Sequence, residues 1–166
     1  SNGDLVAAAY DGSAWGAPQR IAGEGGLDIG WGPSLHIDDA GVWHMSVVDG
    51  LSEDLLYLTS EGVSEIIDGR SLGEHNGIRG DDSSILVLAD GRVRVAYQDS
   101  FYFQLWLAER GTDGLWSTSQ LSGADLGATA SEGFYVGHSP SGTTSVVTGW
   151  FDDPQNDDNG LLLFWM

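Results

Sequence analysis

Short apolar runs separated by Gly-, Asp- and Ser-rich turns follow one another along the chain. The runs are residues 34–39, 41–49, 54–60 and 63–68 in the first half, and 83–90, 91–99, 103–110 and 115–121 in the second. Apolar and polar residues alternate within these runs, which is typical of half-buried β-strands. No stretch combines helical periodicity with helix caps. The pattern therefore predicts an all-β fold.

Three landmarks recur in step along this pattern: the apolar start of a strand, a turn glycine, and an aspartate that ends another strand. They are Leu5, Leu55 and Leu105; Gly41, Gly91 and Gly142; and Asp49, Asp99 and Asp152, with spacings of 50 to 53 residues. A fixed period predicts repeats, here about 4–53, 54–103 and 104–159, with the start of a fourth at 160–166. Four short strands in each repeat predict β-propeller blades of four antiparallel strands. A β-sandwich, which needs no fixed period, is the alternative.

The strands of residues 1–166 amount to about three blades of a single domain, whereas closed propellers have about four to eight. Unpaired strand edges and uncovered apolar sheet faces favour aggregation. We therefore expect this partial propeller to be completed by additional blades, which a second copy or flanking chain would supply.

Composition narrows the classes of partner. Apolar residues make up 41% of the chain, which is enough for a folded core. Six arginines and no lysine stand against 25 acidic residues, and the net charge of −19 repels nucleic acids and anionic lipids. No apolar run approaches the ~18 residues of a membrane-spanning helix, and cysteine is absent. We therefore expect no nucleic-acid partner, no membrane insertion and no thiolate metal site.

Residues 30–62 contain a distinctive set of side chains, and residues 10–15 carry a matching closing turn. The set is Pro33, Ser34, Leu35, Asp39, Gly41, His44, Ser46, Asp49, Leu55, Leu56 and Tyr57. It resembles the repeats of secreted bacterial β-propeller proteins, which are distantly similar to sialidase-like and lectin-like propellers. The resemblance implies the propeller fold and an extracellular or cell-surface location.

The sequence favours a non-enzymatic extracellular module that recognises a glycan or a protein or has a structural role. The common nucleophile, phosphate-binding and zinc-peptidase motifs do not occur in it. One alternative is a fragment of a sialidase-like or other glycoside hydrolase propeller, because carboxylates suited to acid–base catalysis are abundant. Its substrate arginines would come from several blades, whereas Arg79, Arg92 and Arg94 fall in one repeat region. A second alternative is an architectural subunit of a surface assembly.

The candidate ligand-binding residues lie near strand ends. The aspartates at one repeat position would line one face, where they either bind sugar hydroxyls or cations or cap the next turn as Asx-turns. Two tryptophans beside such ends are available for sugar stacking. The predicted ligand-binding set is Trp31, Asp49, Asp99, Trp150 and Asp152. The tryptophans predicted to pack within or between sheets are Trp43, Trp106, Trp116 and Trp165.

Two groups have metal-binding potential. Residues 152–160 form the most acidic stretch, whose oxygen ligands suit Ca²⁺, the one cofactor that the sequence suggests. The spacing of an EF-hand is not present, and a solvated loop is the alternative. His36 and His44 would face each other across a hairpin, either as metal ligands or in a structural role. The candidate metal ligands of the acidic stretch are Asp152, Asp153, Asp157 and Asp158.

Overall fold

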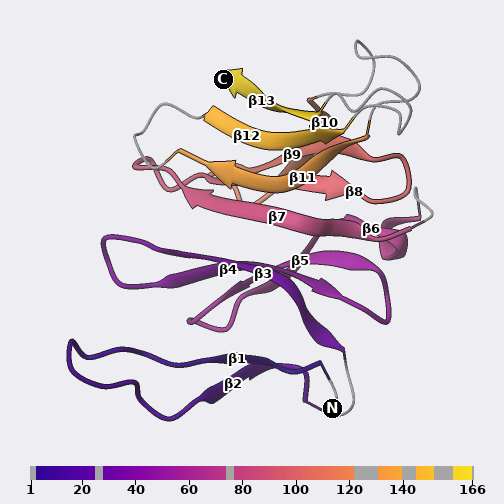
Figure 1. The fold of residues 1–166 in the computed structure, drawn as a ribbon. Coiled ribbons are helices and arrows are strands. Elements are labelled where there is room, and N and C mark those ends of the chain that lie inside the picture. The colour runs from indigo at the N-terminus through magenta and orange to yellow at the C-terminus, as the bar shows by residue number, and fades with distance from the viewer. Residues whose placement is uncertain are drawn as a thin grey trace.

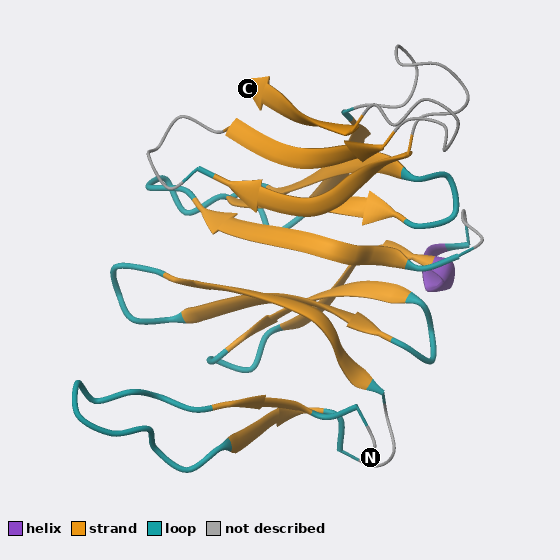
Figure 2. Cartoon of the chain, viewed as in Figure 1, coloured by secondary structure: helices purple, strands orange, loops and turns teal. Residues whose placement is uncertain are grey.

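The computed structural model describes residues 3–24, 28–73, 77–121, 131–139, 145–151 and 159–165, with the backbone alone for 131–135, 145–151 and 159–165. Antiparallel strands make up most of this part of the chain, beside one short 3-10 turn, η1 (Arg70–Leu72) (Figure 2). The all-β prediction is confirmed. No helix among the described residues has the length and apolar character needed to cross a membrane.

The strands form four sheets. A two-stranded sheet holds β1 (Leu5–Ala7) and β2 (Gln19–Ala22), and the first full sheet holds β3 (Ile29–Ile37), β4 (Trp43–Asp49), β5 (Asp54–Thr59) and β6 (Ser64–Gly69). The second full sheet holds β7 (Arg79–Val87), β8 (Val93–Asp99), β9 (Gln104–Arg110) and β10 (Trp116–Gln120). A three-stranded sheet holds β11 (Ser131–His138), β12 (Ser145–Phe151) and β13 (Asn159–Trp165). Both full sheets have the predicted four antiparallel strands in sequence order, and within the described residues the sheets do not close into a ring.

The sheets stack as layers in the order of the sequence (Figure 1). Apolar side chains fill the space between the two full sheets, where Val48, Leu55 and Tyr57 share one cluster with Ile85 and Val95. A second cluster joins the two-stranded sheet to the first full sheet. Burial of these apolar faces is the main driving force that holds one layer on the next.

The first strands of successive sheets lie next to one another, because β7 contacts β3 and also β11. The same hydrogen bond joins both pairs of strands. The N–H of Ile85 donates to Ser34 Oγ, and the N–H of His138 donates to Ser84 Oγ, each over 3.1 Å. Ile85 and His138 therefore occupy equivalent positions in their sheets.

A polar contact joins β6, the outer strand of the first full sheet, to β9 and to the outer strand β10 of the second. Glu65 on β6 accepts hydrogen bonds from Arg110 Nε and Nη2, at 2.8 and 2.7 Å, and from Trp116 Nε1 at 2.8 Å. The hydrogen bonds from Arg110 lower the pKa of Glu65. The Trp116 ring packs edge-on against Tyr57, with ring centroids 5.4 Å apart. This contact fixes how one sheet sits on the other at its outer edge.

Asp38 and two residues of the sequence motif, His44 and Tyr57, brace the β3–β4 hairpin. Asp38 Oδ1 accepts a hydrogen bond from the N–H of Val42, and Asp38 Oδ2 lies 3.3 Å from His44 Nε2. The other ring nitrogen of His44 lies 2.6 Å from the Tyr57 hydroxyl. His36 and His44 oppose each other across the hairpin, as predicted. The described part of the chain holds no metal-binding group of three or more His, Asp or Glu residues, and the contacts of His44 support the structural alternative.

His138 places an ionisable ring at the position where Ile85 is buried in the preceding sheet. Burial, with the positive charge of Arg94, lowers the pKa of His138 to about 4. The unfolded chain takes up this proton near pH 6.5. Stability is therefore complete above about pH 6.5 and is lost as the pH falls towards about 4. We expect the contribution of His138 to the free energy of unfolding to fall by about 2 kcal/mol between about pH 7 and 5.

Urea unfolding of the parent and of His138→Ile at the two pH values measures this contribution. Isoleucine is the residue found at the equivalent position of the second full sheet. The variant is expected to lose about 2 kcal/mol less than the parent over the same pH interval. Equal losses in the two proteins would contradict the assignment.

Candidate functional site

One end of the stacked sheets carries the β4–β5 and β8–β9 turns together with the β6–β7 connection, on the right-hand side of Figure 1. Asp49 and Asp99 end β4 and β8 there, at equivalent positions. Asp49 Oδ1 accepts a hydrogen bond from the N–H of Leu51, and Asp99 Oδ1 accepts two, from the N–H groups of Phe101 and Tyr102. Both aspartates therefore form the Asx-turns that were the alternative to ligand binding. We call this end the turn face, and its described residues are 50–53, 70–73, 77, 78 and 100–103.

Three consecutive aromatic residues, Phe101, Tyr102 and Phe103, project from the β8–β9 turn, and we call them the aromatic turn. Their exposed fractions are 54%, 60% and 41%. The rings of Phe101 and Tyr102 meet edge to face, with centroids 4.8 Å apart. Phe103 has a φ of 53°, a left-handed conformation that is unfavourable for a bulky side chain. Sequence analysis missed this feature, although its signal was visible: three adjacent aromatic residues stand where a polar turn is usual.

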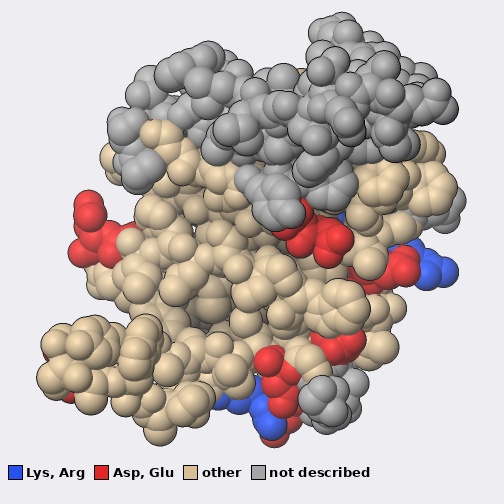
Figure 3. Space-filling model, in the orientation of Figure 1, with Lys and Arg blue, Asp and Glu red and all other residues tan. Residues whose placement is uncertain are grey.

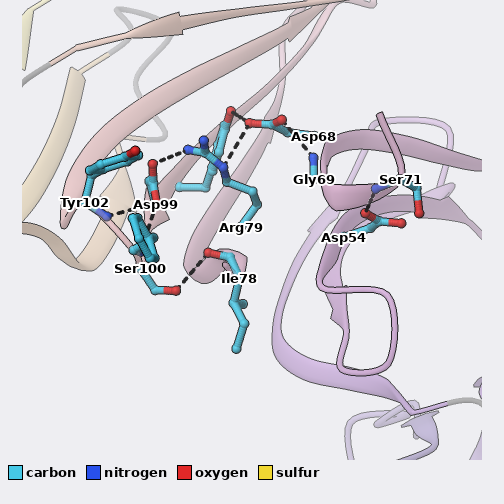
Figure 4. Close-up of polar contacts among 11 residues, drawn as sticks. Asp54, Asp68, Gly69, Ser71, Ile78, Arg79, Asp99, Ser100 and Tyr102 are labelled. Carbon is cyan, nitrogen blue, oxygen red and sulfur yellow. Dashed lines mark hydrogen bonds and ion pairs between the residues drawn. The ribbon is translucent and has the colours of Figure 1, made fainter. Parts of the chain in front are cut away.

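Beneath the aromatic turn lies a buried group of charges, which we call the buried anchor: Asp68, Arg79 and Asp99. Arg79 is 1% exposed, and its Nη1 lies 2.5 Å from Asp99 Oδ2. Its Nε lies 3.8 Å from Asp68 Oδ2, on the strand β6 of the other full sheet. Figure 4 shows Arg79 held between the two carboxylates. The anchor thus joins the first full sheet to the turn that carries the aromatic side chains.

Two aromatic side chains complete the surroundings of the buried anchor. The Tyr97 hydroxyl donates a hydrogen bond of 2.6 Å to Asp68 Oδ2, and burial raises the pKa of Tyr97. The guanidinium of Arg79 lies over the Trp106 ring, 5.2 Å from its centroid. Cation–π contact and ion pairing offset part of the cost of removing this charge from water, while Arg79 Nε, Arg79 Nη1 and Asp99 Oδ2 are buried without a hydrogen-bond partner among the described residues.

The backbone ties the aromatic turn to the β6–β7 connection. Ser100 donates two hydrogen bonds to the carbonyl of Ile78, from its N–H at 3.1 Å and from its Oγ at 2.8 Å (Figure 4). In the first full sheet the N–H of Gly50 donates in the same way to the carbonyl of Asp28. The turn is therefore fixed at its start by the backbone and by the carboxylate of Asp99.

Among the described residues, the equivalent place between the two-stranded sheet and the first full sheet has no buried ion cluster. Ile29 pairs with Asp49 as Arg79 pairs with Asp99. Val47 and Leu56, which stand at the positions of Tyr97 and Trp106, belong to an apolar cluster. The residues at this interface that replace Asp68, Arg79, Tyr97 and Trp106 are Ala22, Ile29, Val47 and Leu56.

Of the other predicted site residues, the structure describes the side chain of Trp31 alone. Trp31 is half-exposed on β3, and its Nε1 lies near Gly50, in the turn of the first full sheet. The side chain of Trp150 and the residues Asp152, Asp153, Asp157 and Asp158 lie outside what the structure describes, so the calcium prediction is not addressed. The packing prediction is confirmed for three tryptophans, Trp43, Trp106 and Trp116.

Each arginine of the chain contacts a carboxylate. The pairs are Arg20–Asp4, Arg70–Glu53, Arg79–Asp99, Arg92–Asp90, Arg94–Glu109 and Arg110–Glu65. In the view of Figure 3 the visible basic atoms lie beside acidic ones. Because 25 acidic residues face only these six positive charges, the surface field stays negative.

The chain matches no protein-family model, and it matches no curated protein. The resemblance to secreted propeller repeats therefore remains a prediction from the motif residues. The function is inferred from the geometry of the turn face.

Proposed function

We propose that the chain is a non-enzymatic recognition module of a secreted or cell-surface β-propeller, and that its turn face binds carbohydrate. The fold part of this proposal takes the stacked sheets as successive blades. Repetition of the Ser34–Ile85 bond at Ser84–His138 supports it, as does the contact of each sheet's first strand with the next. These are the relations expected between neighbouring blades around one axis.

The observation that carries the functional part is the exposed aromatic turn. Aromatic rings offer large, rigid apolar faces, against which the apolar face of a sugar ring can stack. Buried residues fix the start of this turn, so little conformational entropy remains to be lost on binding. A net charge of −19 disfavours sialylated or other anionic glycans, so we propose a neutral oligosaccharide as the ligand.

The sialidase-like alternative finds less support in the described side chains. An enzyme of that kind needs arginines that can turn to a substrate carboxylate. Arg79 is enclosed between Asp68 and Asp99, and Arg94 contacts Glu109 on the neighbouring strand. Arg79 and Arg94 already pair with carboxylates of the fold, so the recognition proposal has more support than hydrolysis of anionic sugars.

Titration calorimetry with chitohexaose and cellohexaose, and with sialyllactose as an anionic comparison, tests the proposal. We expect binding of a neutral oligosaccharide and an affinity about tenfold lower for Tyr102→Ala, since the loss of one stacked ring removes about 1.4 kcal/mol. Trp15→Ala is the matched control, because Trp15 is also a solvent-exposed aromatic residue but lies in the β1–β2 connection. If Trp15→Ala weakens binding and Tyr102→Ala does not, the turn face is not the site.

A further inference from the structure

We propose that Arg79 is a positioning residue: the buried anchor holds the aromatic turn in the conformation that receives the ligand. The ligand part of this inference rests on the proposed function, whereas the positioning part concerns this chain alone. Arg79 would act on the aromatic turn through Asp99, the residue that caps this turn.

The carboxylate of Asp99 divides its two oxygens between the turn and the anchor. Oδ1 accepts the N–H groups of Phe101 and Tyr102, at 2.9 and 3.2 Å. Oδ2 lies 2.5 Å from Arg79 Nη1. The ion pair thus restricts rotation of the carboxylate, and a fixed Oδ1 keeps both amide groups in place.

Arg79 is itself held from the neighbouring sheet. Asp68 lies at the end of β6, where its Oδ1 accepts the N–H of Gly69 at 2.8 Å and its Oδ2 accepts the Tyr97 hydroxyl. The side chains of Arg79 and Asp99 are each 2% exposed, so bulk water does not screen their attraction. A continuous series of contacts therefore runs from the first full sheet through Arg79 to the aromatic turn.

The first full sheet provides an internal comparison. Asp49 caps its turn as Asp99 does, but Ile29 stands opposite it in place of an arginine. Asp49 Oδ2 accepts a hydrogen bond from Ser52 Oγ of its own turn instead. That turn carries Leu51, Ser52 and Glu53 where the second carries three aromatic residues. Of these two turns, the one that presents aromatic side chains is the one with the buried anchor.

An aromatic turn has more need of such support than a polar one. The left-handed backbone is common to both turns, with a φ of 63° at Glu53 and 53° at Phe103, but only the three exposed rings would gain by turning away from water. A fixed carboxylate opposes this tendency and keeps the rings available to a ligand. We therefore expect loss of the anchor to loosen the turn without removing the sheets beneath it.

The triple variant Asp68→Asn/Arg79→Met/Asp99→Asn tests the inference in the whole chain. It removes all three charges at nearly constant volume, and each Asn keeps one acceptor oxygen, which at residue 68 can serve Gly69 while the amide NH2 donates to the Tyr97 hydroxyl, so the fold should persist. Amide hydrogen exchange by NMR should show Phe101 and Tyr102 exchanging at least about tenfold faster than in the parent, with chitohexaose affinity reduced about tenfold. Asp49→Asn is the matched control, because it makes the same carboxylate-to-amide change at a turn that has no buried anchor. The N–H of Leu51, which Asp49 accepts, should exchange less than about threefold faster in this variant than in the parent.

Two further outcomes are decisive. Arg79→Lys keeps the charge of the anchor but not its planar geometry, so we expect folded protein with intermediate exchange rates at Phe101 and Tyr102, even if the triple variant does not fold. Unchanged exchange at both residues in Arg79→Lys and in any folded triple variant would overturn the inference. If the parent binds none of the oligosaccharides, the proposed function fails while the exchange measurement still decides the role of Arg79.

Discussion

Replacement of Arg79 alone by methionine is expected to lower the free energy of unfolding by about 3–5 kcal/mol. The substitution leaves two carboxylates, Asp68 and Asp99, buried within one cluster and without their shared positive partner. Removing one member of a buried charge group costs more than removing the group, because the remaining charges stay out of water. Urea unfolding near neutral pH measures the loss.

Arg70→Met is the matched control for this prediction. Arg70 also pairs with a carboxylate, that of Glu53 at 3.4 Å, but its side chain is 66% exposed. Exposed pairs contribute about 0–1 kcal/mol, so we expect a change of less than about 1 kcal/mol. A loss of that size for Arg79→Met as well would show that the buried anchor is not coupled to the fold.

The periodic features of the fold could be predicted from the sequence. The strands β4, β5, β8, β9 and β10 fall within the predicted runs because alternation of apolar and polar residues determines which face of a strand is buried, whereas β3 and β7 begin before their runs, at Ile29 and Arg79. Asp49 and Asp99 were placed at equivalent turns, because a fixed repeat places equivalent residues at equivalent sites. Their capping geometry also follows from a local rule, since an aspartate side chain reaches the amide two residues ahead.

The buried anchor could not be predicted in the same way. Arg79 has no counterpart at its repeat position, where the first full sheet has Ile29. Its partner Asp68 belongs to another sheet, and only the stacking of the sheets brings the two together. From the sequence, Arg79 is one of three arginines in a single repeat region, and nothing in that pattern predicts its burial or its link to the aromatic turn.

The second large effect concerns the start of β7, where Gly80→Ala is expected to lower the free energy of unfolding by about 2–4 kcal/mol. Gly80 has a φ of 86°, and a Cβ there would overlap with Leu55 Cδ1. Two costs therefore add: about 1 kcal/mol for a left-handed alanine and about 1–3 kcal/mol for overpacking. Urea unfolding measures the sum.

Gly91→Ala and Leu55→Ala separate these two costs. Gly91 has nearly the same φ, 85°, but a Cβ there would meet nothing within 4 Å. Gly91→Ala should therefore lose only the backbone part, about 1 kcal/mol. In a Leu55→Ala background the overlap is gone, so Gly80→Ala should again cost only about 1 kcal/mol, and the double-mutant cycle should show the difference as coupling. Leu55→Ala removes the steric overlap between the two full sheets but leaves the backbone cost at Gly80 unchanged. Equal costs for Gly80→Ala in both backgrounds would therefore show that overlap with Leu55 does not contribute to the loss of stability.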